Sequence, residues 1–363
     1  MGGGRLEFVA EAAALRAAAS RVAKVVPSSP QMPELGAVLV EADGDRVALT
    51  ATDVQVWLTM ASPAEVLTPG ASALPCRAFA SLCGELEGTV RVRCEEDGVL
   101  VGWKSGRWVL NRFDPSGFPK PPAVGGVELE VPAAELAAGL AQVLPAASKD
   151  EGQGAMAGVA WDPDGWLVAT DAVRLAARRF VPFRGAGLAV LPREAASLLA
   201  SCLPDRGSVK VVLSTTFASF AWEGGCLTAR LLGQRYPNWR QVATVSPAVA
   251  VRARVEDLIA CFERAVAAAG DDFPAVVVRL GAGALEVEGK STAARTREEV
   301  PCACASGSSL EVRFNASLVL DGLKASRRAG AEEVHWGFAG EEAVSVLEAG
   351  DSYRYLVLPL RKS

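Results

Sequence analysis

The apolar residues of this 363-residue chain follow two periods, one typical of helices and one of strands. Up to about Val26, the residues Leu15, Ala18, Val22 and Val25 recur every three or four positions, which predicts a helix with one apolar face. Similar stretches predict helices near residues 76–86, 133–144, 193–202, 255–268 and 316–325. Short alternating or apolar stretches predict strands near residues 6–9, 90–93, 107–110, 127–131, 209–213, 217–222, 227–232, 334–338 and 343–347. The mixture predicts an α+β fold.

Part of this pattern is repeated. The tripeptide Ala51-Thr52-Asp53 returns as Ala169-Thr170-Asp171, and each copy follows two apolar stretches that flank an Asp-Gly turn. The Leu-Pro pairs that precede two of the helices keep nearly the same spacing, and a fainter third copy starts at Phe273-Pro274. We therefore predict three repeated domains, each with two helices and antiparallel sheets, over residues 1–124, 125–246 and 247–363.

Bulk properties narrow the class of protein. Half of the residues are hydrophobic and the net charge is −5, so any contact with nucleic acid has to be a local positive surface. The eight cysteines form no C-x-x-C pair, and residues 1–5 do not resemble a signal peptide, so we expect reduced thiols and a cytoplasmic protein. No apolar run reaches the roughly 20 residues that cross a membrane.

Candidate catalytic or metal-binding groups are few. The single histidine, His335, lies in a predicted strand, where a structural role is the simpler interpretation. Cys302 and Cys304 are too close together for a usual zinc site. The sequence Gly289-Lys290-Ser291 lacks the glycine that a phosphate-binding loop requires five residues before Gly289. We expect no enzyme activity, no metal and no cofactor.

The repeated aspartates allow two interpretations. Asp53 and Asp171 can be turn caps that accept backbone hydrogen bonds, or they can be catalytic carboxylates. We favour the caps. Only the second copy is followed by an arginine between apolar residues, Arg174, so the enzyme alternative would be a cleft that uses Asp171 and Arg174.

The basic residues form no dense run but lie on or beside the six predicted helices. They either belong to ordinary solvated helix faces or form a positive surface, if the helices share one side of the molecule. The residues we predict to face DNA in the second case are Arg16, Arg21, Lys24, Arg77, Lys149, Arg193, Arg254, Arg264, Lys324 and Arg327.

The order of several motifs resembles the bacterial DNA polymerase III β subunit family, the sliding clamps. These motifs are residues 169–175 (ATDAVRL), residues 235–239 (RYPNW), residues 314–320 (FNASLVL) and the segment 355–361 (YLVLPLR). The resemblance covers essentially the whole chain. It implies the DNA clamp fold, with two subunits closed head to tail into a homodimeric ring that encircles duplex DNA without reading its sequence. Such a clamp tethers the replicative polymerase for processive replication.

The resemblance also implies a pocket between the second and third domains that binds a short peptide carried by the polymerase III catalytic subunit, the clamp loader and other partners. Carried over by position, it comprises Met156, Thr170, Ala172, Val173, Arg174, Leu175, Pro237, Gln241, Val242, Leu356, Leu358, Pro359, Leu360 and Arg361. Many members have Gly-His in place of Ala172-Val173 and an arginine in place of Gln241, so we expect a more apolar and less basic pocket. The alternative for the C-terminal run is an ordinary edge strand.

For the subunit interface, the resemblance points to Trp108 and Leu110 meeting Ala267 and Ala268 of the other subunit. Trp108 could instead belong to the core. A remaining alternative function keeps the fold but makes the protein an accessory, clamp-like scaffold that binds peptides without encircling DNA.

Overall fold

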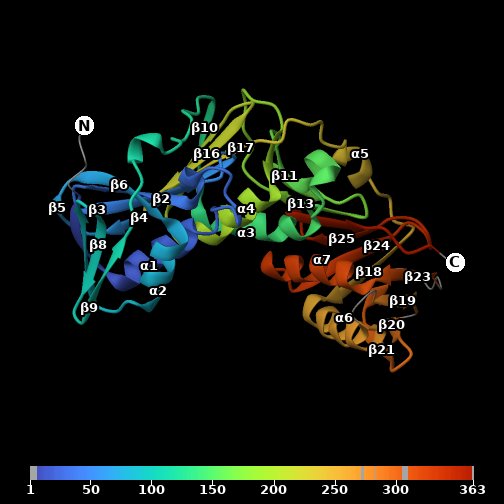
Figure 1. The fold of residues 1–363 in the computed structure, drawn as a ribbon. Helices are drawn as coiled ribbons and strands as arrows, with labels where there is room; N and C mark the ends of the chain where they lie inside the picture. The colour runs from blue at the N-terminus through green and yellow to red at the C-terminus, as the bar shows by residue number, and fades with distance from the viewer. Residues whose placement is uncertain (1–5, 271–273, 282, 305–309, 362–363) are drawn as a thin grey trace. The chain divides into compact units, whose positions relative to one another are not determined.

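The computed structural model describes residues 6–270, 274–281, 283–304 and 310–361. It divides into two compact units, Met1–Ala133 with Cys202–Arg230 (unit 1) and Ala134–Ser201 with Leu231–Ser363 (unit 2). Both units combine helices with antiparallel sheets, which confirms the predicted α+β class (Figure 1). Because the predicted middle domain is divided between the units, the three domain boundaries stay a prediction.

Unit 1 contains two antiparallel sheets and two helices. The five-stranded sheet has the order β5-β1-β7-β8-β9, and the eight-stranded sheet has the order β10-β15-β16-β17-β4-β3-β2-β6. The strands of the first are β1 (Glu7–Glu11), β5 (Glu65–Thr68), β7 (Thr89–Glu95), β8 (Gly98–Trp103) and β9 (Gly106–Leu110). Those of the second are β2 (Ala37–Asp43), β3 (Arg46–Thr52), β4 (Val56–Pro63), β6 (Gly70–Pro75), β10 (Val127–Pro132), β15 (Ser208–Leu213), β16 (Phe217–Trp222) and β17 (Gly225–Arg230).

Helices α1 (Ala12–Val22) and α2 (Cys76–Glu85) pack against each other and bury their apolar faces. The sequence predicted that the first helix continues to Val26, but α1 ends at Val22. Lys24 and Val25 instead donate to the carbonyls of Arg21 and Val22, which are three residues back, so the chain turns there and buries Val25.

Unit 2 contains a nine-stranded and a four-stranded antiparallel sheet. The first has the order β14-β11-β12-β13-β26-β25-β24-β18-β22 and the second β21-β20-β19-β23. The nine strands are β11 (Gly158–Asp162), β12 (Trp166–Thr170), β13 (Arg174–Arg179), β14 (Ala189–Pro192), β18 (Val249–Arg254), β22 (Ala303–Cys304), β24 (Glu333–Phe338), β25 (Ser345–Ala349) and β26 (Tyr353–Val357). The other four are β19 (Ala275–Leu280), β20 (Ala284–Lys290), β21 (Arg295–Pro301) and β23 (Leu310–Asn315).

The pairing of β13 with β26 joins the second and third repeats into one sheet. Five residue pairs form this junction, from Arg174 opposite Val357 to Arg178 opposite Tyr353. The C-terminal run is therefore a central strand bonded on both sides, by β13 and by β25. The alternative of an ordinary edge strand is wrong, because β26 has a partner strand on each side.

Five α-helices of the described residues lie wholly or mainly in unit 2. They are α3 (Ala133–Val143), α4 (Arg193–Cys202), α5 (Trp239–Ala243), α6 (Val255–Ala269) and α7 (Ala316–Arg328). Figure 1 shows α6 and α7 side by side, and α7 packs against β25 and β26. Tyr355 of β26 donates its hydroxyl to the Leu318 carbonyl (2.6 Å), and its ring occupies the space where a side chain at Gly322 would lie. The sequence predicted all of these helices except α5.

No helix within the described residues is long and apolar enough to span a membrane. The same residues contain no cluster of three metal-ligating side chains. Cys76 and Cys83, in α2, are buried free thiols, and burial raises the pKa of each to about 12, which keeps them protonated. Phe273, which opens the third repeat, lies outside the described residues, as does the side chain of Cys304.

Candidate functional site

The turns that follow the two Ala-Thr-Asp copies have the same hydrogen bonds. Asp53 Oδ1 accepts from the backbone N–H groups of Gln55 (2.9 Å) and Val56 (2.7 Å). Asp171 Oδ1 accepts in the same way from Val173 (3.1 Å) and Arg174 (3.0 Å). These contacts confirm that both aspartates are turn caps.

Each turn also holds a non-glycine residue in the left-handed region. Val54 has φ 64° and Ala172 has φ 72°, and each donates its N–H to the threonine two residues earlier, Thr52 (2.9 Å) or Thr170 (3.2 Å). The Thr170 hydroxyl in turn donates to the Arg174 carbonyl (2.6 Å). The strained backbone and its hydrogen bonds turn the side chain of Val173 outward, where it is 46% exposed.

Arg174 ties the second turn to helix α7. Its Nε donates to Asp171 Oδ2 (2.9 Å) and its Nη1 to Asp321 Oδ2 (2.5 Å), and only 9% of the side chain is exposed. Burial alone would lower its pKa, but Tyr355, Asp171 and Asp321 outweigh burial and raise it, so the guanidinium stays charged. The side chains of Asp171 and Arg174 are thus bonded to each other, to Asp321 and to the backbone of the turn.

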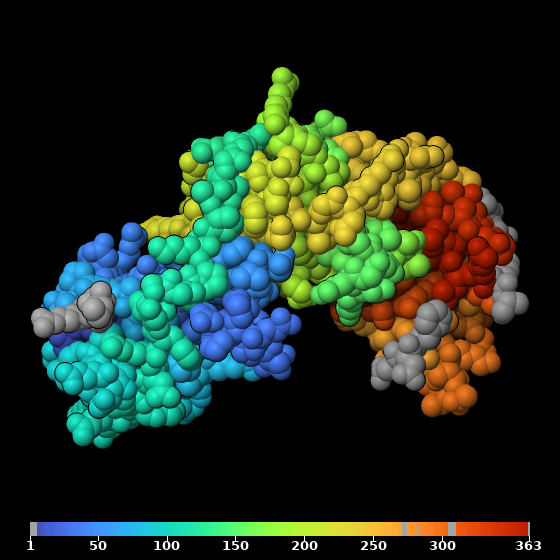
Figure 2. All heavy atoms as spheres, turned by 45° about the horizontal axis from the view of Figure 1, so that its top comes forward, coloured from blue at the N-terminus to red at the C-terminus, as the bar shows by residue number. Residues whose placement is uncertain are grey.

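Helix α5 is anchored to the hairpin of β11 and β12, whose second strand leads into this turn. Trp239 Nε1 donates to Asp162 Oδ2 (3.0 Å), and Arg240 donates to both oxygens of Asp162 (2.7 and 2.6 Å) and to Asp164 (2.6 Å). Burial alone would raise the pKa of Asp162, but the hydrogen bonds from Arg240 and Trp239 outweigh it and hold the pKa below its usual value. Figure 2 shows the segment that includes α5, in gold, at the surface.

A cavity of about 440 Å³ lies between the turn, α5 and the end of β26, all within unit 2. We call it the apolar pocket. It is lined by Thr170, Ala172, Val173, Arg174, Leu175, Gln241, Val242, Thr244, Val245, Ser246, Ala339, Val344, Leu356 and Leu358. Val173, Val242 and Leu358 are among the most exposed large apolar side chains of the described residues, at 46%, 52% and 44%. A cluster of this kind at a cavity mouth is typical of a site that binds an apolar ligand.

The structure brings together nine of the predicted pocket residues. The five others, Met156, Pro237, Pro359, Leu360 and Arg361, do not line the cavity. The Leu360 N–H is bonded to the Arg313 carbonyl (2.7 Å), which draws the chain toward β23. Sequence reasoning missed Thr244, Val245, Ser246, Ala339 and Val344. The first three begin two residues after Val242, so extending the motif was a usable signal. Ala339 and Val344 flank β24 and β25 and are placed by the pairing of these two strands.

The residues predicted to face DNA differ in their exposure and in the groups they are bonded to. Arg264, Lys324 and Arg327 are paired with Glu298, Glu263 and Glu256, which offsets their charge. Arg16 donates to the carbonyls of Cys83 and Leu86 and so caps the C-terminus of α2. Arg77 donates to the Pro27 carbonyl, and Arg193 is half-buried. Of the rest, Lys24, Lys149 and Arg254 are exposed and Arg21 is half-buried, with no ion pair to a described residue.

The predicted interface residues differ in accessibility. Trp108 is 46% exposed on β9, an outer strand of its sheet, so the core alternative for Trp108 is wrong. Leu110, two residues further along the same strand, is buried in unit 1, so its side chain is not on the surface as predicted. Ala267 and Ala268 lie near the end of α6, exposed and half-buried respectively. His335 is exposed on β24.

Known proteins are similar to this chain in both sequence and fold. Residues 6–122 match the family model described as DNA polymerase III beta subunit, N-terminal domain. The Beta sliding clamp of Synechococcus elongatus is 29% identical over 331 residues, 86% of this chain and 88% of the relative. The Beta sliding clamp of Pseudomonas aeruginosa is 24% identical over 369 residues, 98% of this chain and 100% of the relative. A crystal structure of the P. aeruginosa DnaN sliding clamp bound to griselimycin superposes with a TM-score of 0.90 at 24% identity, over 99% of this chain and 100% of that one.

The repeated α+β architecture and this superposition define a protein of the DNA clamp fold. The pocket beside Ala169-Thr170-Asp171 lies on the sheet that joins the second and third repeats. Residues 6–122 thus match the DNA polymerase III beta subunit family, and nearly the whole chain is similar in sequence to β sliding clamps.

Proposed function

We propose that two copies of this protein close head to tail around duplex DNA and tether the replicative polymerase through the apolar pocket. The observation that carries this proposal is the 440 Å³ cavity beside Val173, Val242 and Leu358, on a fold that matches a sliding clamp over 99% of the chain. A topological link needs only weak phosphate contacts, which suits a chain with a net charge of −5. The tether involves no catalysis or cofactor.

The subunit contact would use the exposed side of β9. Trp108 and Val109, both 46% exposed, give this outer strand apolar side chains, and its backbone is available for pairing along one side. Partners would be the polymerase III catalytic subunit, the clamp loader and other proteins that carry the same kind of peptide. Exposed apolar side chains at the pocket mouth would pack against apolar peptide residues.

The decisive experiment loads the protein onto nicked circular DNA with its loader and measures retention at high salt, before and after the circle is cut. A topological link survives salt on circles and is lost from free ends, whereas charge-driven binding weakens with salt on both substrates. Equal retention on circular and linear DNA would contradict encirclement.

The second candidate is the accessory scaffold, and two observations bear on it. Acidic partners offset Arg264, Lys324 and Arg327, and Leu110 is withdrawn into the core, so both the positive surface and the interface are weaker than predicted. Sedimentation distinguishes the two: a stable monomer that still binds partner peptide would support the scaffold. The enzyme alternative is disfavoured, because Asp171 and Arg174 are engaged in structural contacts.

A further inference from the structure

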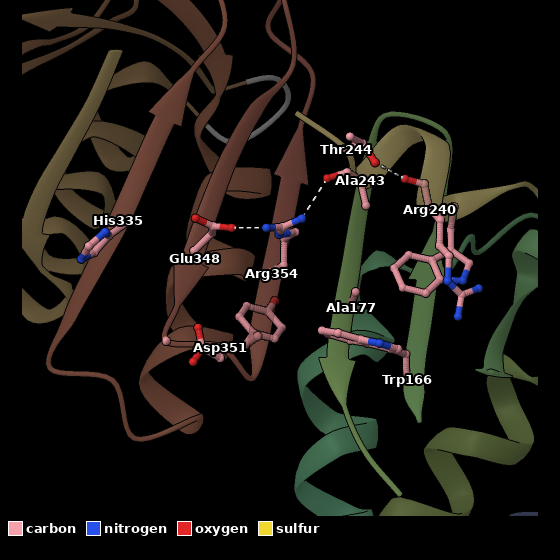
Figure 3. A pocket seen from close by; sticks show the side chains of 12 residues that line it. Trp166, Ala177, Arg240, Ala243, Thr244, His335, Glu348, Asp351 and Arg354 are labelled. Carbon is pink, nitrogen blue, oxygen red and sulfur yellow. Dashed lines mark hydrogen bonds and ion pairs between the residues drawn. The ribbon is translucent and has the colours of Figure 1, made fainter. Parts of the chain in front are cut away.

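A second cavity, of about 600 Å³, lies next to the apolar pocket in unit 2. We call it the polar pocket. It is lined by Trp166, Ala177, Trp239, Arg240, Ala243, Thr244, His335, Glu348, Gly350, Asp351, Tyr353 and Arg354. Figure 3 shows His335, Glu348 and Arg354 in a row across three neighbouring strands, with Trp166 and Asp351 below them. The predicted peptide site contains none of these residues.

The two cavities occupy one face of the nine-stranded sheet. Along β26, Leu356 lines the apolar pocket and Arg354, two positions away, lines the polar pocket. Along β13, Leu175 likewise lines the apolar pocket and Ala177 lines the polar pocket. Residues two positions apart in a strand point to the same side of the sheet. Thr244 lines both cavities. Two positions of a strand span roughly 7 Å, so a peptide in the apolar pocket needs only a few more residues to reach the polar one.

The cations of the polar pocket already have partners. Arg240 is bonded to Asp162 and Asp164, and Arg354 is bonded to Glu348 and to the Ala243 carbonyl (3.0 Å). Asp351 is exposed and forms no ion pair with a described residue. The half-buried Trp166 lines the same cavity, and its ring already has the Arg179 guanidinium over it, 5.1 Å from the ring centroid. The exposed carboxylate of Asp351 is therefore the group of this cavity that is suited to a lysine or arginine side chain.

We propose that the polar pocket docks a basic segment that flanks the apolar core of the same partner peptides. This inference rests on the proposed function of the apolar pocket. The shared lining residue Thr244 and the two-residue spacing along β13 and β26 supply the short path, and the carboxylate of Asp351 supplies the charge complementarity. The partners it would favour are those whose clamp-binding segment continues into lysine or arginine.

The test uses the full-length protein and labelled peptides copied from the clamp-binding segment of the host polymerase. At each end the peptide is extended with Gly-Lys-Lys, Gly-Ser-Ser or Gly-Glu-Glu, and affinities are measured by fluorescence anisotropy at low and high salt. We expect one lysine extension to tighten binding about two- to fivefold over serine, and high salt to remove the gain. The Asp351→Asn variant should lose the gain and still bind the unextended peptide as the wild type does.

Glu299→Gln is the matched control, because Glu299 is an exposed carboxylate on the four-stranded sheet of the same unit. It should keep the lysine gain. A gain that persists in Asp351→Asn, or tighter binding of the glutamate extension, would overturn the inference and leave the apolar pocket intact. Failure of the wild type to bind even the unextended peptide would instead overturn the docking role of the apolar pocket, and the inference with it.

Discussion

Two residues carry unusual backbone strain, and the repeat places them at matching positions. Val54 (φ 64°) and Ala172 (φ 72°) both sit one residue after the capping aspartate. A left-handed conformation costs an L-residue about 1–2 kcal/mol, and a β-branched residue is especially unfavourable there. The cost is tolerated because three side-chain hydrogen bonds fix each turn.

We therefore expect Val54→Gly to raise the free energy of unfolding of unit 1 by roughly 1 kcal/mol, since relief of strain exceeds the added entropy of the unfolded chain. Ala172→Gly should gain less, because alanine is strained less than valine. Urea unfolding midpoints test the order. A loss of stability in Val54→Gly would mean that its half-exposed side chain, and not its backbone, dominates.

A second prediction at the scale of single residues concerns Arg174. Arg174→Ala leaves the carboxylates of Asp171 and Asp321 without their shared cation, so we expect a loss of roughly 2 kcal/mol, below the range for a fully buried pair because Asp321 is 41% exposed. Peptide affinity should fall with it. Asp321→Asn keeps the pocket lining unchanged and should weaken binding only about two- to fivefold. Equal affinities in wild type and Asp321→Asn would show that α7 does not position the turn.

At the scale of elements, α5 illustrates why five residues can form a stable feature. Isolated helices of this length are unstable, so α5 depends on tertiary contacts. Trp239 packs against Trp166, with ring centroids 5.8 Å apart, and belongs to the core that includes Leu175, Val346 and Leu356. The sequence did not predict α5, because five residues are too few to establish a helical period. The bonds to Asp162 anchor it.

The Asp162 contacts predict how α5 responds to acid. Since the pKa of Asp162 is lowered in the fold, its stabilising effect is present above the pKa of an unfolded aspartate, about 4, and is lost as pH falls through the lower folded value. Tryptophan fluorescence should therefore change below about pH 4. Asp162→Asn should weaken this response and reduce peptide affinity already at pH 7. An unchanged acid transition in the variant would contradict the role of Asp162.

Sequence periodicity located most elements, because helices such as α4 and α6 carry a full apolar face and hairpins such as β11–β12 carry an Asp-Gly turn. Sequence periodicity could not locate the strand pairings between repeats. The register of β17 with β4, or of β13 with β26, depends on strands far apart in sequence that are apolar on both faces. The apolar pocket was predicted in large part because its turn has a sequence motif. The polar pocket was not predicted, because it arises where five strands and α5 meet.

At the scale of the whole molecule, the proposed ring would depend on an interface whose residues make different contributions. Trp108→Ala removes an exposed aromatic side chain, so we expect it to weaken dimerisation at least tenfold with little loss of stability. Leu110→Ala empties a buried position and should destabilise unit 1 by about 2–4 kcal/mol. Analytical ultracentrifugation and thermal unfolding separate the two effects. A Trp108→Ala protein that dimerises normally would place the interface elsewhere.

The central position of β26 also has a consequence for how the protein is made. The hairpins β11–β13 leave the ribosome long before β26 is translated, so β13 presents an unpaired edge to the cytosol in the meantime. One wall of the apolar pocket, Leu356 and Leu358, arrives only with that late strand. A nascent chain thus lacks a complete apolar pocket until β26 is in place, and the edge of β13 is an aggregation-prone strand during that interval.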